Sequence, residues 1–138
     1  DLTFENTTNL WSNTAPTFSN GAVYADLDND GDLDIVTNNI NEKLTLLENN
    51  STRSSLKHFL QVEFDGPTTN IFGVGATVNL YFGDGAKQTR QLVNSRGFLS
   101  SVSNVLYFGL GDRTSIDELE VIWPDGKVQL LKDVNANQ

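Results

Sequence analysis

The stretch "YADLDNDGDLDIV", residues 24–36, places an aspartate on every second position between two short apolar runs. Its five aspartates are Asp26, Asp28, Asp30, Asp32 and Asp34. Like charges this close repel one another and cost stability unless something neutralises them. Alternate carboxylates in a tight loop can converge on one point, where a hard divalent cation turns their repulsion into attraction. The stretch therefore predicts a metal-binding loop between two β-strands.

Calcium is the cation that this pattern favours, because it takes six to eight oxygen ligands at about 2.3–2.6 Å and tolerates flexible loops. Asp26, Asp28 and Asp30 stand at loop positions 1, 3 and 5, where they would supply side-chain oxygens. Asp32 at position 7 would offer its backbone carbonyl, and Asp34 at position 9 would close the site with its carboxylate. Magnesium fits less well, since it prefers rigid octahedral geometry and retains several waters.

The loop begins like an EF-hand but does not end like one. Gly31 at position 6 permits the sharp turn that such a loop requires. Position 12, which is glutamate in an EF-hand, is Thr37 here. The flanks "AVYADL" and "LDIVTNN" alternate as strands do. We therefore expect an EF-like calcium loop that joins two β-strands.

Short alternating runs broken by Gly, Asn and Asp fill the rest of the chain, and no apolar stripe of helical period appears. The runs before the polar stretch "NNSTRSS" cover residues 21–27, 33–38 and 44–49. The later runs centre on residues 60–64, 76–82, 88–93, 105–108, 119–123 and 128–130. We predict an all-β chain of two parts, residues 1–53 and residues 57–138. The spacing of strands in the second part is typical of a β-sandwich or small barrel.

Composition excludes several classes of function. The net charge is −9, with nine acidic and two basic residues in 1–56 (−7) and nine acidic and seven basic in 57–138 (−2). No basic patch exists to bind nucleic-acid phosphates or anionic lipids, and no apolar run approaches the roughly 18 residues of a membrane span. The chain has no cysteine, so disulfides and thiolate sites are excluded. It begins at Asp1 and has no methionine, so we expect it to be a piece of a longer protein.

Two stretches resemble known families. "FSNGAVYADLDNDGDLDIVTNNINEKLTLLENN", residues 18–50, is similar to the FG-GAP/VCBS repeat, one blade of a calcium-stapled β-propeller. "GVGATVNLYF", "RGFLSSVSNVLYFGLGD" and "VIWPDGK", within residues 73–127, resemble the ASPIC/UnbV domain of the cartilage acidic protein-like and bacterial secreted type. The resemblance implies a propeller-type β-blade followed by a β-sandwich domain, with no catalytic residues to carry over.

Together, the loop and the resemblance predict a calcium-binding, non-catalytic binding or adhesion module, extracellular or on the cell surface. The alternative is an accessory carbohydrate-binding module of a secreted glycan-utilisation system, for which Trp11, Tyr107 and Trp123 are the aromatic candidates. An enzyme is disfavoured. His58 lacks a nucleophile motif, and the pair Glu118 and Glu120 lies on the solvated face of a strand.

A single blade is not expected to be stable by itself. A propeller needs at least four blades, whereas one repeat is present here. One small sheet is marginal in water, and exposed apolar surface tends to be buried by association. We therefore expect residues 1–53 to pack on the C-terminal domain or on a second copy of the chain.

Overall fold

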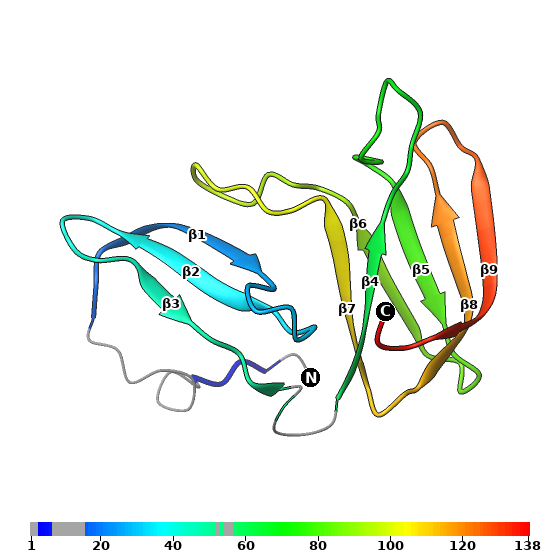
Figure 1. Cartoon of the computed structure of the whole chain (residues 1–138), viewed down its shortest axis with the longest axis horizontal. Helices are drawn as coiled ribbons and strands as arrows, with labels where there is room; N and C mark the ends of the chain where they lie inside the picture. The colour runs from blue at the N-terminus through cyan, green and yellow to red at the C-terminus, as the bar shows by residue number, and fades with distance from the viewer. Residues whose placement is uncertain (1–2, 7–15, 52, 54–56) are drawn as a thin grey trace.

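The computed structural model describes residues 3–6, 16–51, 53 and 57–138. Every element with defined bounds in this part of the chain is a β-strand, and the strands form three antiparallel sheets (Figure 1). The all-β prediction is confirmed. None of the described residues belongs to a helix long and apolar enough to cross a membrane.

The first sheet has the order β1–β2–β3 and carries the aspartate loop. Its strands are β1 (Ser19–Ala25), β2 (Asp34–Asn39) and β3 (Thr45–Leu47). The sequence predicted strands that reach residue 27 and restart at residue 33, but β1 ends just before Asp26 and β2 begins at Asp34. The loop-side ends of both strands stop short of the prediction because backbone N–H groups of the loop bond to aspartate side chains instead of a neighbouring strand.

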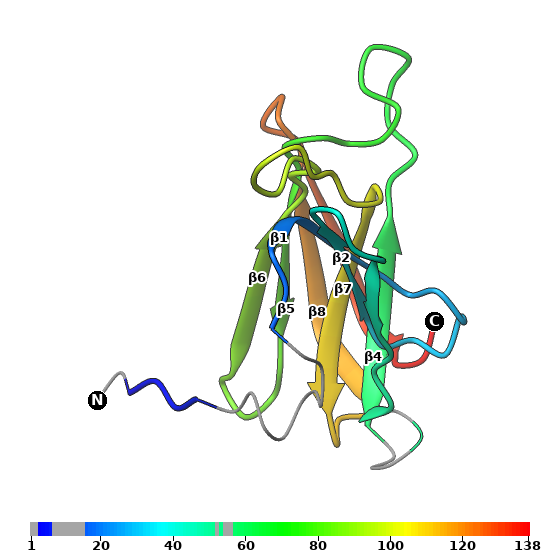
Figure 2. The ribbon, with the colours of Figure 1, turned by 90° about the vertical axis from the view of Figure 1, so that its left-hand side faces the viewer.

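The second part of the chain is a sandwich of unequal sheets. One sheet pairs β4 (His58–Glu63) with β7 (Val105–Gly111). The other has the order β6–β5–β8–β9. Its strands are β5 (Thr77–Tyr81), β6 (Lys87–Gln91), β8 (Ser115–Ile122) and β9 (Val128–Asn135). Figure 2 shows the two sheets layered against each other. Among the described residues no strand pairing joins the two sheets, so this is an open sandwich and not a closed barrel.

The hydrophobic core lies between these two sheets. Alternation along β7 and along the second half of β8 turns every second side chain inward, as the period of a β-strand requires. The largest fully buried side chains are Val78, Leu80, Leu92, Phe108, Leu110 and Ile116. All but Leu92, which directly follows β6, come from strands of the two sheets, and buried Leu60 of β4 joins the same core. The sequence-predicted sandwich thus follows from the alternation of residues 60–64, 76–82 and 105–108.

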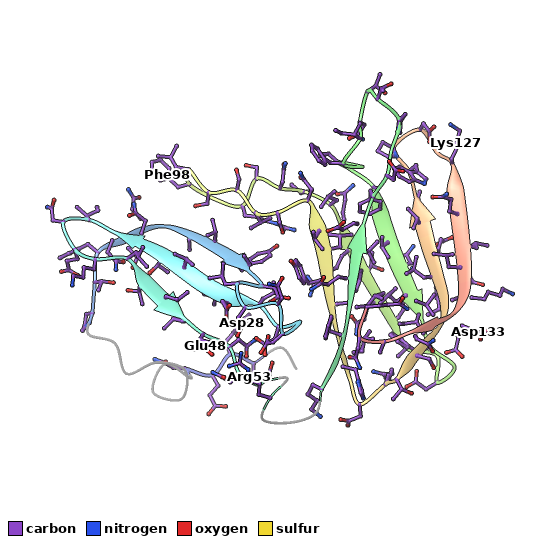
Figure 3. All side chains as sticks on the ribbon, in the orientation of Figure 1. Asp28, Glu48, Arg53, Phe98, Lys127 and Asp133 are labelled. Carbon is purple, nitrogen blue, oxygen red and sulfur yellow. The ribbon has the colours of Figure 1, made fainter. Side chains whose placement is uncertain are left out.

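The three-stranded sheet contacts the sandwich at both ends. The backbone N–H of Ala22 in β1 donates to Ser100 Oγ (3.2 Å), which belongs to the β6–β7 connection. Figures 1 and 3 show this connection reaching over the first sheet, with Phe98 at its tip. At the other end the aspartate loop lies against β4, where Gln61 donates to Asp26. The first sheet is therefore covered in part by its own chain.

Candidate functional site: the aspartate loop

The loop between β1 and β2 curls around the side chain of its first aspartate. Asp26 Oδ1 accepts a hydrogen bond from Asp30 N and Asp26 Oδ2 accepts one from Gly31 N, both at 3.1 Å. Asp30 Oδ1 in turn accepts from Asp32 N at 3.1 Å. Gly31 has φ +90°, a conformation that L side chains rarely adopt. These bonds close the loop, so that carboxylate oxygens of Asp26, Asp28 and Asp30 all lie within 4.8 Å of one another.

Asp34, the first residue of β2, anchors the base of the loop. Its side chain is buried, with 3% exposure for the residue. Asp34 Oδ2 accepts from Leu27 N (3.2 Å), and Asp34 Oδ1 accepts from Asn49 N (2.8 Å). One carboxylate therefore ties the start of the loop to the segment that follows β3. Asp32 is also buried, and its Oδ2 accepts from Ser51 Oγ at 3.2 Å.

The structure thus divides the five predicted metal ligands into two groups. It brings together the carboxylates of Asp26, Asp28 and Asp30. The carboxylates of Asp32 and Asp34 bond to groups of the polypeptide at the base of the loop. Each carboxylate oxygen has two lone pairs, so Asp34 retains acceptor capacity beyond its backbone bonds. The five-residue calcium site remains a prediction.

Arg53 lies at the open side of the loop and was not predicted as part of the site. Its Nη2 contacts Asp28 Oδ2, its Nε lies 3.2 Å from Asp30 Oδ2, and its Nη1 lies 2.8 Å from Glu48 Oε1. Figure 3 shows Arg53, Asp28 and Glu48 gathered at this point. Asp28, followed by Asp30 and Glu48, raises the pKa of Arg53 above its usual value. One feature of the sequence could have indicated this contact: Arg53 is one of only two basic residues among residues 1–56.

Two residues of β4 also reach the loop from the sandwich. Gln61 Nε2 donates to Asp26 Oδ2 at 3.0 Å, so the amide orients one of the predicted ligands. Phe59 packs so closely on the loop that a Cβ built on Gly31 would lie 2.0–2.4 Å from the ring carbons. Both residues alternate with Leu60, which points into the core. Alternation with Leu60 puts both side chains on the outer face of β4, but it does not indicate that they contact the aspartate loop.

His58 and Glu120, two of the residues weighed for catalysis, hydrogen-bond to neighbouring polar side chains. The ring of His58 contacts the side chain of Asn137 at 3.0–3.3 Å. Glu120 Oε2 accepts hydrogen bonds from Asn79 Nδ2 (2.7 Å) and Tyr81 OH (3.0 Å) on the outer face of the larger sheet. These contacts join β4 to the segment after β9, and β8 to β5.

Trp123 directly follows β8, which ends at Ile122. Its indole Nε1 donates to Gln129 Oε1 at 2.6 Å, and its ring meets Phe64 edge-on, with ring centroids 5.6 Å apart. It lines an open cavity of about 710 Å³ together with Asp65, Asn70, Pro124 and other residues. Trp11, the other tryptophan, lies outside the described residues.

The fold is therefore all-β, with a small three-stranded sheet and its aspartate loop followed by a two-sheet β-sandwich. The family model described as "ASPIC and UnbV" matches residues 66–138, and the chain belongs to this family. Cartilage acidic protein 1 of Mus musculus is 33% identical over 113 residues, and that of Homo sapiens is 31% identical over 113 residues. Each alignment covers 78% of this chain and 16–17% of the relative, so the chain spans about a sixth of the relatives' length.

Proposed function

We propose that this chain is a calcium-binding, non-catalytic binding or adhesion module of an extracellular or cell-surface protein. In this proposal residues 1–53 are an FG-GAP/VCBS-type propeller blade with an EF-like calcium loop, and residues 57–138 are the ASPIC/UnbV domain. The observation that carries the proposal is the convergence of three carboxylates within 4.8 Å in the loop. Similarity to cartilage acidic protein 1 supports the extracellular location.

The spacing of these oxygens suits calcium. Two oxygens that each lie about 2.4 Å from one ion are at most about 4.8 Å apart. The oxygens of Asp26, Asp28 and Asp30 meet this condition. Asp34 and the backbone carbonyl of Asp32 would add ligands from the base of the loop. Calcium would supply charge neutralisation and would hold the loop closed, a structural role suited to the millimolar calcium found outside cells.

Isothermal calorimetry on chelator-treated protein tests the proposal. We expect one calcium ion to bind per chain. At free calcium about 100-fold above the dissociation constant, linkage adds about 2.7 kcal/mol to the free energy of unfolding. For a chain of this size that raises the melting temperature by about 8 °C. Asp28→Asn, which removes one ligand charge, should weaken binding, whereas Asp84→Asn in the exposed β5–β6 turn should not. Absence of both binding heat and thermal shift at millimolar calcium would refute the proposal.

The cavity beside Trp123 favours a second candidate function, glycan binding. Its volume of about 710 Å³ lies within the range of small-molecule sites, and carboxylate, amide and aromatic side chains line it together. These are the groups that hydrogen-bond and stack on sugars. If the candidate is correct, a glycan array should give discrete hits that Trp123→Ala abolishes and that Tyr107→Ala retains. An array on which the wild-type protein binds nothing would rule this function out.

A further inference from the structure

We propose that Arg53 is an internal counter-ion of the aspartate loop, which calcium must displace in order to bind, so that Arg53 sets the calcium affinity of the site. The calcium part of this inference rests on the proposed function. The counter-ion part rests on the contacts of Arg53 alone and can be measured without any metal.

Arg53 contacts the predicted ligands themselves. Its guanidinium bonds to Oδ2 of Asp28 and lies 3.2 Å from Oδ2 of Asp30. The guanidinium also lies 2.8 Å from Glu48, the residue that follows β3, and this contact helps to hold it in place. The rigid, planar donor group of arginine can bridge several carboxylates in this way, which a lysine ammonium cannot do with the same geometry.

Calcium and the guanidinium compete for these oxygens. An ion bound to Asp28 and Asp30 would lie about 2.4 Å from oxygens that Arg53 also contacts, which places two cations within about 5 Å of each other. Cations at that distance repel each other appreciably, even near the protein surface. A guanidinium stays charged in proteins, so Arg53 cannot yield by losing its proton. It has to move away from Asp28 and Asp30 when the ion binds.

The position of Arg53 gives the loop a counter-charge in the absence of metal. The only other basic residue among residues 1–56 is Lys43, in the β2–β3 connection. The side chain of Arg53 is half exposed, at 52%, so the ion pairs are screened and open to exchange with solvent ions. A displaceable partner of this kind keeps the loop formed at low calcium and weakens the apparent affinity for calcium.

Arg53→Gln tests both parts of the proposal. We expect calorimetry to show calcium binding about tenfold tighter than in the wild type, because one competing positive charge is gone. In excess chelator the same variant should melt about 2–4 °C lower, since the aspartates lose their counter-charge. Arg113→Gln is the matched control. Arg113 pairs with Asp84 at 2.9 Å on the sandwich, so this variant has the same net charge but leaves the loop untouched. Arg53→Lys should fall between wild type and Arg53→Gln.

The outcomes separate this inference from the proposed function. If wild type binds calcium and Arg53→Gln binds no more tightly than Arg113→Gln does, the inference is overturned and the proposed function stands. Unchanged melting of Arg53→Gln in chelator would also overturn it. Binding by Arg53→Gln but not by wild type would confirm Arg53 as the competing cation and overturn calcium binding by the natural chain. If no variant binds calcium, the proposed function and the calcium part of this inference both fail, and the melting of Arg53→Gln in chelator decides the counter-ion part.

Discussion

Replacing Gly31 with alanine is expected to lower the free energy of unfolding by about 3 kcal/mol, measured by chemical denaturation in the presence of chelator. Two effects add. Gly31 has φ +90°, where a side chain is strained by about 1–2 kcal/mol. The new methyl group would also lie 2.0–2.4 Å from the ring carbons of Phe59, so either the ring or the loop must move. Such overpacking costs about 1–3 kcal/mol.

A double-mutant cycle separates the two effects. Phe59→Ala removes the ring that the alanine methyl group would meet, but it leaves the backbone conformation of Gly31 unchanged. The loss caused by Gly31→Ala should therefore be smaller by about 1–2 kcal/mol in the Phe59→Ala background. Gly85→Ala is a control for strain alone, because Gly85 has φ +82° with nothing within 4 Å of its added Cβ. Strictly additive losses would show that the loop does not pack on Phe59 as the structure has it.

The aspartate spacing predicted a loop between two strands because its information is local. Alternate carboxylates and a glycine at the turn are enough to specify a closed loop, and the structure brings Asp26, Asp28 and Asp30 together as the spacing implied. The strands of the second part were also predictable, since inward residues such as Leu80 and Leu119 recur with the period of a β-strand. The alternation indicates which face of each strand is buried. Two sheets that each have one apolar face can bury those faces against each other, which gives a sandwich.

The parts that could not be predicted depend on contacts between distant segments. Arg53 belongs to the polar stretch "NNSTRSS", yet it contacts Asp28, 25 residues earlier in the chain. Gln61 reaches Asp26 from another sheet, 35 residues away. No local pattern encodes such pairs. The role expected of Asp34 was also incomplete, because spacing cannot show that a carboxylate has buried backbone N–H groups to satisfy.

Replacing Asp34 with alanine is the other substitution with a large expected effect. We expect the free energy of unfolding in excess chelator to fall by about 3 kcal/mol. Both oxygens of this buried carboxylate accept backbone hydrogen bonds, one from Leu27 and one from Asn49. A hydrogen bond to a charged group contributes about 1.5–3 kcal/mol, and relief of repulsion from the neighbouring aspartates offsets part of the loss. Chelator keeps any loss of bound calcium out of this comparison.

Two further variants show whether Asp34 stabilises the loop through the hydrogen bonds that it accepts from backbone N–H groups. Asp34→Asn preserves the shape but retains only one acceptor oxygen, so its loss of stability should be intermediate. Asp117→Ala removes an exposed carboxylate that accepts one backbone bond, from Gly83 N, and should cost about 1 kcal/mol or less. If Asp34→Ala cost no more than Asp117→Ala, the carboxylate would not anchor the loop. Asp34 would then act in calcium binding alone, and the variant would lose stability only where calcium is present.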